Sequence, residues 1–116
     1  MVYKFAYSEA IAESSTENRE SERTLLLQSI EMMKLAESAG MQSRQSIEAT
    51  HFVTRLWCHF IEDLGRPENS LPPELRAKLI SIGLFLIKAA EEVRVGERRS
   101  FTGMIEITST IAEGLK

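Results

Sequence analysis

The stretch ENSLPPELRAKLISIG, from Glu68 to Gly83, decides how the second half of the chain folds. It places two prolines directly ahead of a run that carries no charge between Lys78 and Lys88. The residue before a proline is pushed away from helical angles, whereas a proline at the first helical position loses no hydrogen bond. Pro73 therefore starts a helix instead of breaking one, and we expect this helix to run to about Val95.

This helix is more apolar than one buried face requires. The apolar side chains of its middle point in every direction around the axis: Leu79, Ile80, Ile82, Leu84, Phe85, Leu86 and Ile87. Such a helix is either surrounded by others or keeps a second apolar face for a partner. Gly83 costs about 1 kcal/mol relative to alanine in mid-helix, which indicates close approach of another helix, from the same bundle or from another protein.

Three further helices follow from apolar residues at helical spacing and from residues that favour helix ends. Ser14 and Glu17 match a capping box for the first of them. A glycine marks the end of each of the four helices, and a serine precedes three of them. We expect the first helix at about Ser15 to Ala39, ended by Gly40, and the second from a Ser43 cap to a stop at Gly65 and Pro67. The helix that Pro73 starts should stop at Gly96, and the last helix should run from a Ser100 cap to Gly114.

The chain as a whole predicts a single all-α domain over residues 1–116, a small bundle of about four helices with an extended aromatic arm at its amino terminus. Its 116 residues, 43% hydrophobic and 27% charged, suit one packed core. The only alternating stretch, formed by Tyr3, Phe5 and Tyr7, is too short to make a sheet by itself. We expect this arm to lie across the helices or to become ordered on binding.

The charge distribution argues against a protein held to nucleic acid mainly by its charge, because the net charge is -3. The one basic cluster consists of Arg94, Arg98 and Arg99, with two glutamates among them. Cations near a helix end are favoured by the helix dipole, which is the simpler interpretation. RNA contact through the three arginines is the alternative, although only Phe101 lies near in sequence as a stacking group.

The sequence shows no arrangement typical of catalysis or of metal binding. His51 and Cys58 share a helix face, but they lie about 10 Å apart along the axis, which is too far for one zinc ion. There is no G-x-S-x-G turn and no phosphate-binding loop. We therefore expect no enzyme activity, no metal and no cofactor.

The composition also predicts a cytoplasmic protein. The single cysteine excludes an internal disulfide, and the amino terminus lacks the features of a secretion signal. The longest uncharged apolar run, Leu79 to Ile87, is less than half of the ~20 residues that a membrane span needs. We expect this run to face a protein interior or an interface, not a membrane.

Several motifs spread along the chain match one family in order. They are YKFAYSEA at residues 3–10, RLW at 55–57, PENSLPPELRAKLISIG at 67–83, VRVG at 93–96, FTGMIEI at 101–107 and GL at 114–115. In these motifs the chain resembles FlaF, a family of small flagellar biosynthesis regulators of certain bacteria. The resemblance implies a role in flagellin production, in a pathway shared with the flagellin translation regulator FlbT, and direct binding of flagellin before export as a secretion chaperone.

An acidic helical protein with surplus apolar surface suits this role, since such a surface accommodates an amphipathic helix in a groove. We expect the contact residues to be Leu84 and Phe85 with Trp57, Phe60 and the arm residues Tyr3, Phe5 and Tyr7. Three alternatives stay open: action on flagellin messenger RNA, directly or through FlbT; action on the pathway partner only; and a second copy of the chain that covers the same apolar surface.

Overall fold

The structure is a computed structural model that describes the backbone of residues 15–114 and the side chains of residues 20–114. Four α-helices make up this part of the chain: α2 (Ser15–Ala39), α3 (Arg44–Leu64), α4 (Pro73–Arg94) and α5 (Thr102–Gly114). Residues 15–114 contain no strand, so the prediction of an all-α bundle is confirmed. The predicted aromatic arm with Tyr3, Phe5 and Tyr7, and the capping box at Ser14, lie outside the described residues.

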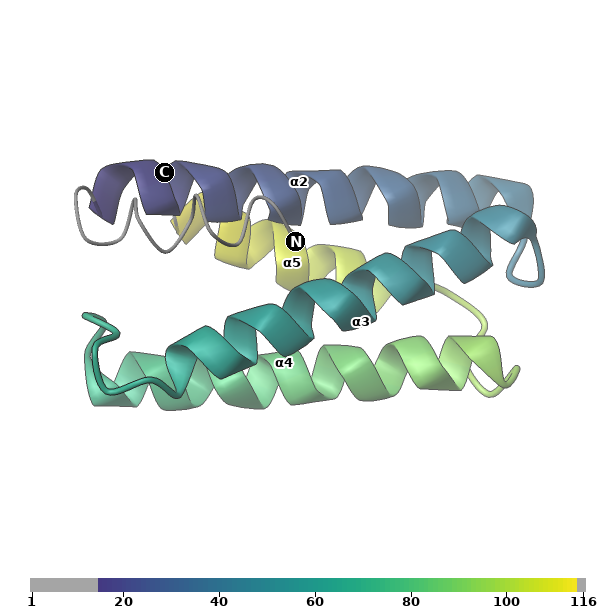
Figure 1. Cartoon of the computed structure of the whole chain (residues 1–116). Helices are drawn as coiled ribbons and strands as arrows, with labels where there is room; N and C mark the ends of the chain where they lie inside the picture. Colours follow the sequence, from purple (N-terminus) through teal and green to yellow (C-terminus); the bar gives the residue numbers. More distant parts are fainter. Residues whose placement is uncertain (1–14, 115–116) are drawn as a thin grey trace.

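The helices run up and down in sequence order (Figure 1). The central helix is α3, which packs against α2 on one side and α4 on the other, while α5 packs against α2. Short connections force consecutive helices to be antiparallel, as expected for a bundle. The chain therefore places α2 and α4 on opposite sides of α3.

The helix ends follow the residues that the sequence offers there. The side chain of Ser43 accepts a hydrogen bond from the backbone N–H of Ser46, which satisfies one free donor of α3. Gly40 and Gly96 have φ values of 115° and 81°, the left-handed region that glycine enters without strain. Pro73 is the first residue of α4. The double proline thus begins a helix, as predicted.

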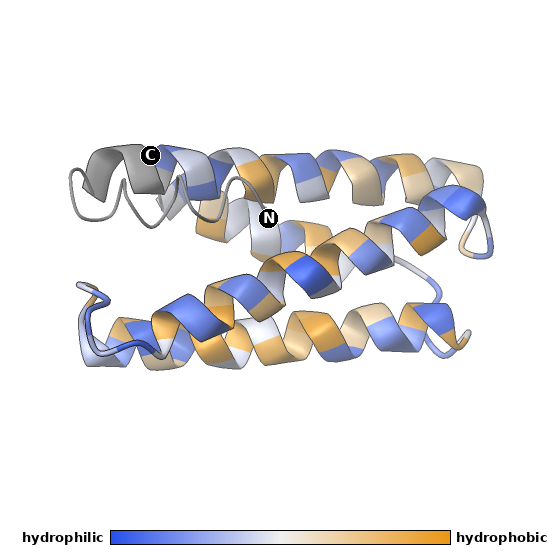
Figure 2. Cartoon of the chain, viewed as in Figure 1, coloured by the Kyte–Doolittle hydropathy of each residue, from blue (hydrophilic) through white to orange (hydrophobic). Residues whose placement is uncertain are grey.

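The core is made by one face of each helix. Figure 2 shows hydrophobic and hydrophilic residues interleaved along the helices, with hydrophobic residues predominating in the middle of α4. The largest fully buried apolar side chains come from all four helices: Leu26 and Met33 of α2, Val53 and Trp57 of α3, Leu86 and Val93 of α4, and Met104 of α5, with Phe101 just before it.

Gly83 lets α4 approach α3 closely. A Cβ atom built on Gly83 would lie 2.6 Å from Cε3 of Trp57 and 3.0 Å from Cδ1 of Ile61. The indole ring of Trp57 fills the space that a side chain would need, and it meets the ring of Phe60 edge-on at 5.2 Å between centroids. The close approach predicted from Gly83 is therefore confirmed, and it comes from within the bundle.

Candidate functional site

An apolar strip of α4 remains on the surface. Ile80, Leu84 and Ile87 follow one another at four- and three-residue spacing, so they share a side of the helix. Leu84 is 57% exposed, and Ile80 and Ile87 are half-buried. Leu84 stands two positions before the buried Leu86, which turns it about 200° away from the core at 3.6 residues per turn.

The neighbouring helix α3 borders this side of α4. Gly83, one turn after Ile80, is buried against α3, and Ile61 of α3 lies against it. Ile61 is itself half-buried. We refer to Ile61, Ile80, Leu84 and Ile87, the partly or largely exposed apolar residues near this helix junction, as the Leu84 surface.

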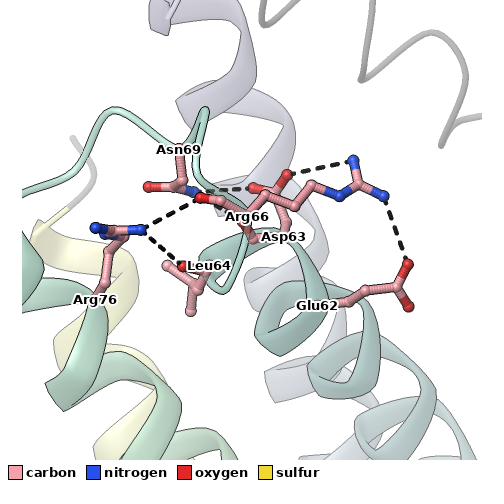
Figure 3. Close-up of polar contacts among 6 residues, drawn as sticks. All are labelled: Glu62, Asp63, Leu64, Arg66, Asn69 and Arg76. Carbon is pink, nitrogen blue, oxygen red and sulfur yellow. Dashed lines mark hydrogen bonds and ion pairs between the residues drawn. The ribbon is translucent and has the colours of Figure 1, made fainter.

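Polar contacts between α3 and α4 fix the position of this surface (Figure 3). Arg76 of α4 reaches back to the end of α3, where its Nη1 donates to the backbone oxygens of Leu64 at 3.4 Å and Arg66 at 3.3 Å. These carbonyls lie at or just beyond the last turn of α3, where such oxygens lack partners within a helix. Arg76 thereby ties the start of α4 to the end of α3.

Asn69 organises the connection between the two helices (Figure 3). Its Nδ2 donates to the backbone oxygen of Asp63 at 3.3 Å and to Oδ2 of the same residue at 3.2 Å. Its Oδ1 accepts from the backbone N–H of Leu71 at 3.0 Å, a local turn typical of asparagine. Burial raises the pKa of Asp63, and this effect exceeds the lowering by the Arg66 guanidinium and by the Asn69 hydrogen bond.

Phe85 lies on another side of α4 from Leu84, because consecutive helical residues are about 100° apart. Phe85 is 41% exposed, and the guanidinium of Arg98 lies over its ring at 5.6 Å from the centroid. Arg98 also donates from Nε and Nη2 to Oε1 of Glu92 at 3.1 and 3.0 Å. Leu84 and Phe85 therefore do not form one open surface, since Arg98 covers part of the phenylalanine.

The three arginines of the predicted basic cluster have different environments. Arg94 makes a bidentate pair with the carboxylate of Glu91, with its closest contact at 2.8 Å. Arg98 is engaged with Glu92 and Phe85. Arg99 is exposed. Two of the three guanidinium groups are thus already matched by a carboxylate, which lowers the positive field available to a phosphate.

The aromatic residues of α3 lie deeper than the sequence analysis expected. Trp57 is 2% exposed, because α4 packs over it at Gly83. It is therefore a core residue and not part of an exposed contact surface. Phe60 is half-buried and packs on the edge of Trp57. Of the seven residues proposed for partner binding, only Leu84 and Phe85 are classed as exposed among those that the structure describes.

A second apolar depression, which the sequence analysis missed, lies between α2 and α3. It is a groove of about 300 Å³ whose floor is formed by Leu25 and Met32 of α2 with Phe52 and Leu56 of α3. Glu48, His51 and Arg55 complete its lining. Leu25 and Met32, seven residues apart, share one side of α2, and Phe52 and Leu56, four residues apart, share one side of α3. The sequence does not show that these two helix sides meet.

None of the helices within residues 15–114 has the length and hydropathy that crossing a membrane would require.

Comparison with known proteins supports the resemblance seen in the sequence motifs. Searches of curated proteins and of solved structures give no significant match. Residues 3–115 match the profile of a protein family described as Flagellar protein FlaF. This match covers nearly the whole chain and includes all four helices. The chain therefore belongs to the FlaF family, with a role in flagellum biogenesis or its regulation.

Proposed function

We propose that this protein binds flagellin in the cytoplasm through the Leu84 surface and holds it as a secretion chaperone until export. The observation that carries the proposal is the 57% exposure of Leu84 in the middle of an apolar strip. Contiguous apolar surface on a folded protein commonly marks a site for another protein. The function is binding, and no residue is assigned a catalytic step.

The geometry of the strip fits an amphipathic helix. Ile80 and Ile87 are seven residues apart, so the strip extends about 10 Å along α4, or two helical turns. A partner helix presents its anchors at the same three- and four-residue spacing. Lys88 and Glu91 are exposed near one end of the strip, where they supply a polar rim around the apolar centre.

A helical end of flagellin is the proposed occupant. An apolar helix face that packs against other subunits in a filament is exposed in a free subunit, and covering it keeps the subunit from self-association. The Leu84 surface offers a matching face without demanding any chemical change in the flagellin. Sequestration of this kind connects binding to the regulation of flagellum assembly.

Calorimetric titration of the full chain with purified flagellin tests the proposal. We expect saturable binding with a negative heat-capacity change, because apolar surface is buried in the complex. Titration with FlbT in place of flagellin distinguishes action on the pathway partner, and sedimentation of the protein by itself detects a second copy on the same surface. Absence of heat and of co-sedimentation with flagellin would remove the proposal.

Action on flagellin messenger RNA has less support from the geometry. Only Arg99 of the three arginines is exposed without a carboxylate in contact within the described residues. The nearest aromatic side chain in sequence, Phe101, is fully buried and offers no stacking surface to a base. We therefore keep flagellin, not RNA, as the proposed ligand.

A further inference from the structure

The groove between α2 and α3 is a separate site from the Leu84 surface, which lies at the junction of α3 and α4. We propose that this groove binds the amino-terminal segment of the same chain, with Tyr3, Phe5 and Tyr7 on the apolar floor. The floor residues Leu25, Met32 and Phe52 are only half-buried, so they leave apolar area uncovered between two packed helices. This proposal does not depend on flagellin binding.

The segment is long enough to reach the groove. Leu25 and Met32 lie ten and seventeen residues after Ser15, or about 15 and 25 Å along α2 at 1.5 Å per residue. The residues that precede Ser15 span up to about 3.3 Å each when extended. Measured from Ser15, Tyr7 therefore reaches up to about 26 Å and Tyr3 up to about 40 Å. A segment that turns back along α2 spans the groove and retains several residues for the turn.

The side-chain pattern of the segment suits an apolar floor. Tyr3, Phe5 and Tyr7 occupy every second position, so an extended backbone directs all three rings to the same side. Tyrosine rings bury their apolar edges while their hydroxyl groups stay in water at a groove rim. The thioether of Met32 adds a favourable contact for an aromatic ring.

The order of charges along the segment matches the order along the groove. Because α2 and α3 are antiparallel (Figure 1), Arg55 lies toward the Leu25 end of the groove and Glu48 toward the Met32 end. A segment that runs back along α2 brings Glu9 toward Arg55 and Lys4 toward Glu48. Neither Glu48 nor Arg55 forms an ion pair with another residue of the described part of the chain.

Covalent attachment favours this occupant over a segment of another molecule. A tethered segment meets its groove at an effective concentration of roughly millimolar, whereas a free peptide or a second copy must bind from dilute solution. Weak apolar contacts of three rings are then sufficient for occupancy. The groove and the segment thus form an intramolecular pair.

Photo-crosslinking in the full chain tests the location of the segment. Phe5 is replaced by p-benzoylphenylalanine, and the products of irradiation are mapped by mass spectrometry. We expect crosslinks within one chain to Met32, Phe52 or their immediate neighbours, at a yield independent of protein concentration. Crosslinks mainly to other helices, or crosslinks only between two chains, would overturn the proposal.

Methionine-methyl NMR provides a second readout in the full chain. Replacing Tyr3, Phe5 and Tyr7 by alanine removes the aromatic rings, and we expect the Met32 methyl signal to shift while that of Met104, buried on α5, stays in place. An unchanged Met32 signal would contradict the proposal, as would an equal shift of Met104. Lys4→Glu is expected to move Met32 in the same direction, and combining it with Glu48→Lys to restore the original signal.

Discussion

The backbone of Gly83 lies so close to Trp57 that a Cβ atom on Gly83 would stand 2.6 Å from Cε3 of the indole. This contact joins α4 to the centre of α3 and explains why glycine interrupts the most apolar part of the chain. It also places Leu84, the next residue, on the surface. The core contact and the candidate binding surface therefore depend on the same short segment of α4.

Gly83→Ala should destabilise the protein, although alanine is the better helix former. The gain in helix propensity is about 1 kcal/mol, whereas forcing a methyl group against a buried ring costs about 1–3 kcal/mol. We expect a net loss of about 1 kcal/mol in the free energy of unfolding, measured by urea denaturation. Gly103→Ala is the matched control, because nothing lies within 4 Å of its added Cβ, and it should stabilise α5 by about 0.5 kcal/mol. Equal effects of the two substitutions would contradict this account.

The positions of the helices could be predicted from sequence because their determinants are local. Ser43 and Pro73 act on the first turns of their own helices, and Gly40 and Gly96 act on the last turns of theirs. Each works within a few residues of itself. Hydrophobic spacing supplied the rest, so the helices were found within one or two residues of their observed bounds.

The surface could not be predicted in the same way, because it depends on contacts between distant residues. Periodicity could not assign Trp57 to the core, since that depends on how closely α4 packs at Gly83. The division between Leu84 and Phe85 depends on Arg98, which folds back over the helix after its end. A sequence pattern shows which residues share a helix side, but it does not show which sides are covered.

The cap of α5 is another long-range contact, and it yields a testable effect. Oε1 of Glu37 on α2 accepts a hydrogen bond from the backbone N–H of Phe101 at 2.6 Å. Ser100, which the sequence analysis assigned as the cap, accepts from the N–H of Thr102 through its Oγ. Glu37→Ala should lower the free energy of unfolding by about 1 kcal/mol, since a helix-terminal donor loses its partner. Glu37→Gln should lose less, and Glu31→Ala, on the exposed side of α2, should have little effect in the same denaturation series.

The pKa of Asp63 predicts a pH dependence of stability. Burial raises this pKa in the folded protein, so folding favours the protonated acid. Its favourable contribution is therefore complete below the unfolded-state pKa of about 3.9 and is lost as the pH rises through the folded-state pKa. The free energy of unfolding of the Asp63→Asn variant, relative to that of the wild type, should consequently increase as the pH rises from 3 to 7. Denaturation curves at both pH values measure this difference. A relative stability of the variant that decreases from pH 3 to pH 7 would contradict a pKa of Asp63 raised by burial.

Salt distinguishes apolar binding of flagellin from phosphate binding. Contacts from three arginines to a single-stranded RNA would weaken binding about a hundredfold over a tenfold rise in salt. Apolar contact with the Leu84 surface should change the dissociation constant by less than about threefold over the same range, because no counterions are released. Titrations with flagellin and with its messenger RNA at 50 and 500 mM salt measure both slopes. A steep slope for flagellin would assign its binding to charge instead of to the apolar strip.

Leu84→Ala should weaken flagellin binding about tenfold without affecting the fold. Leu84 is more than half exposed, so truncation removes little from the core and should change the free energy of unfolding by less than about 0.5 kcal/mol. If a flagellin helix covers the exposed part, losing it costs about 1.4 kcal/mol of binding, which is a factor of ten. Leu35→Ala is the matched control, since Leu35 is 62% exposed on α2, away from the Leu84 surface. Calorimetry should show weakened binding only for the Leu84 variant, and the same affinity for both variants would exclude the Leu84 surface as the site.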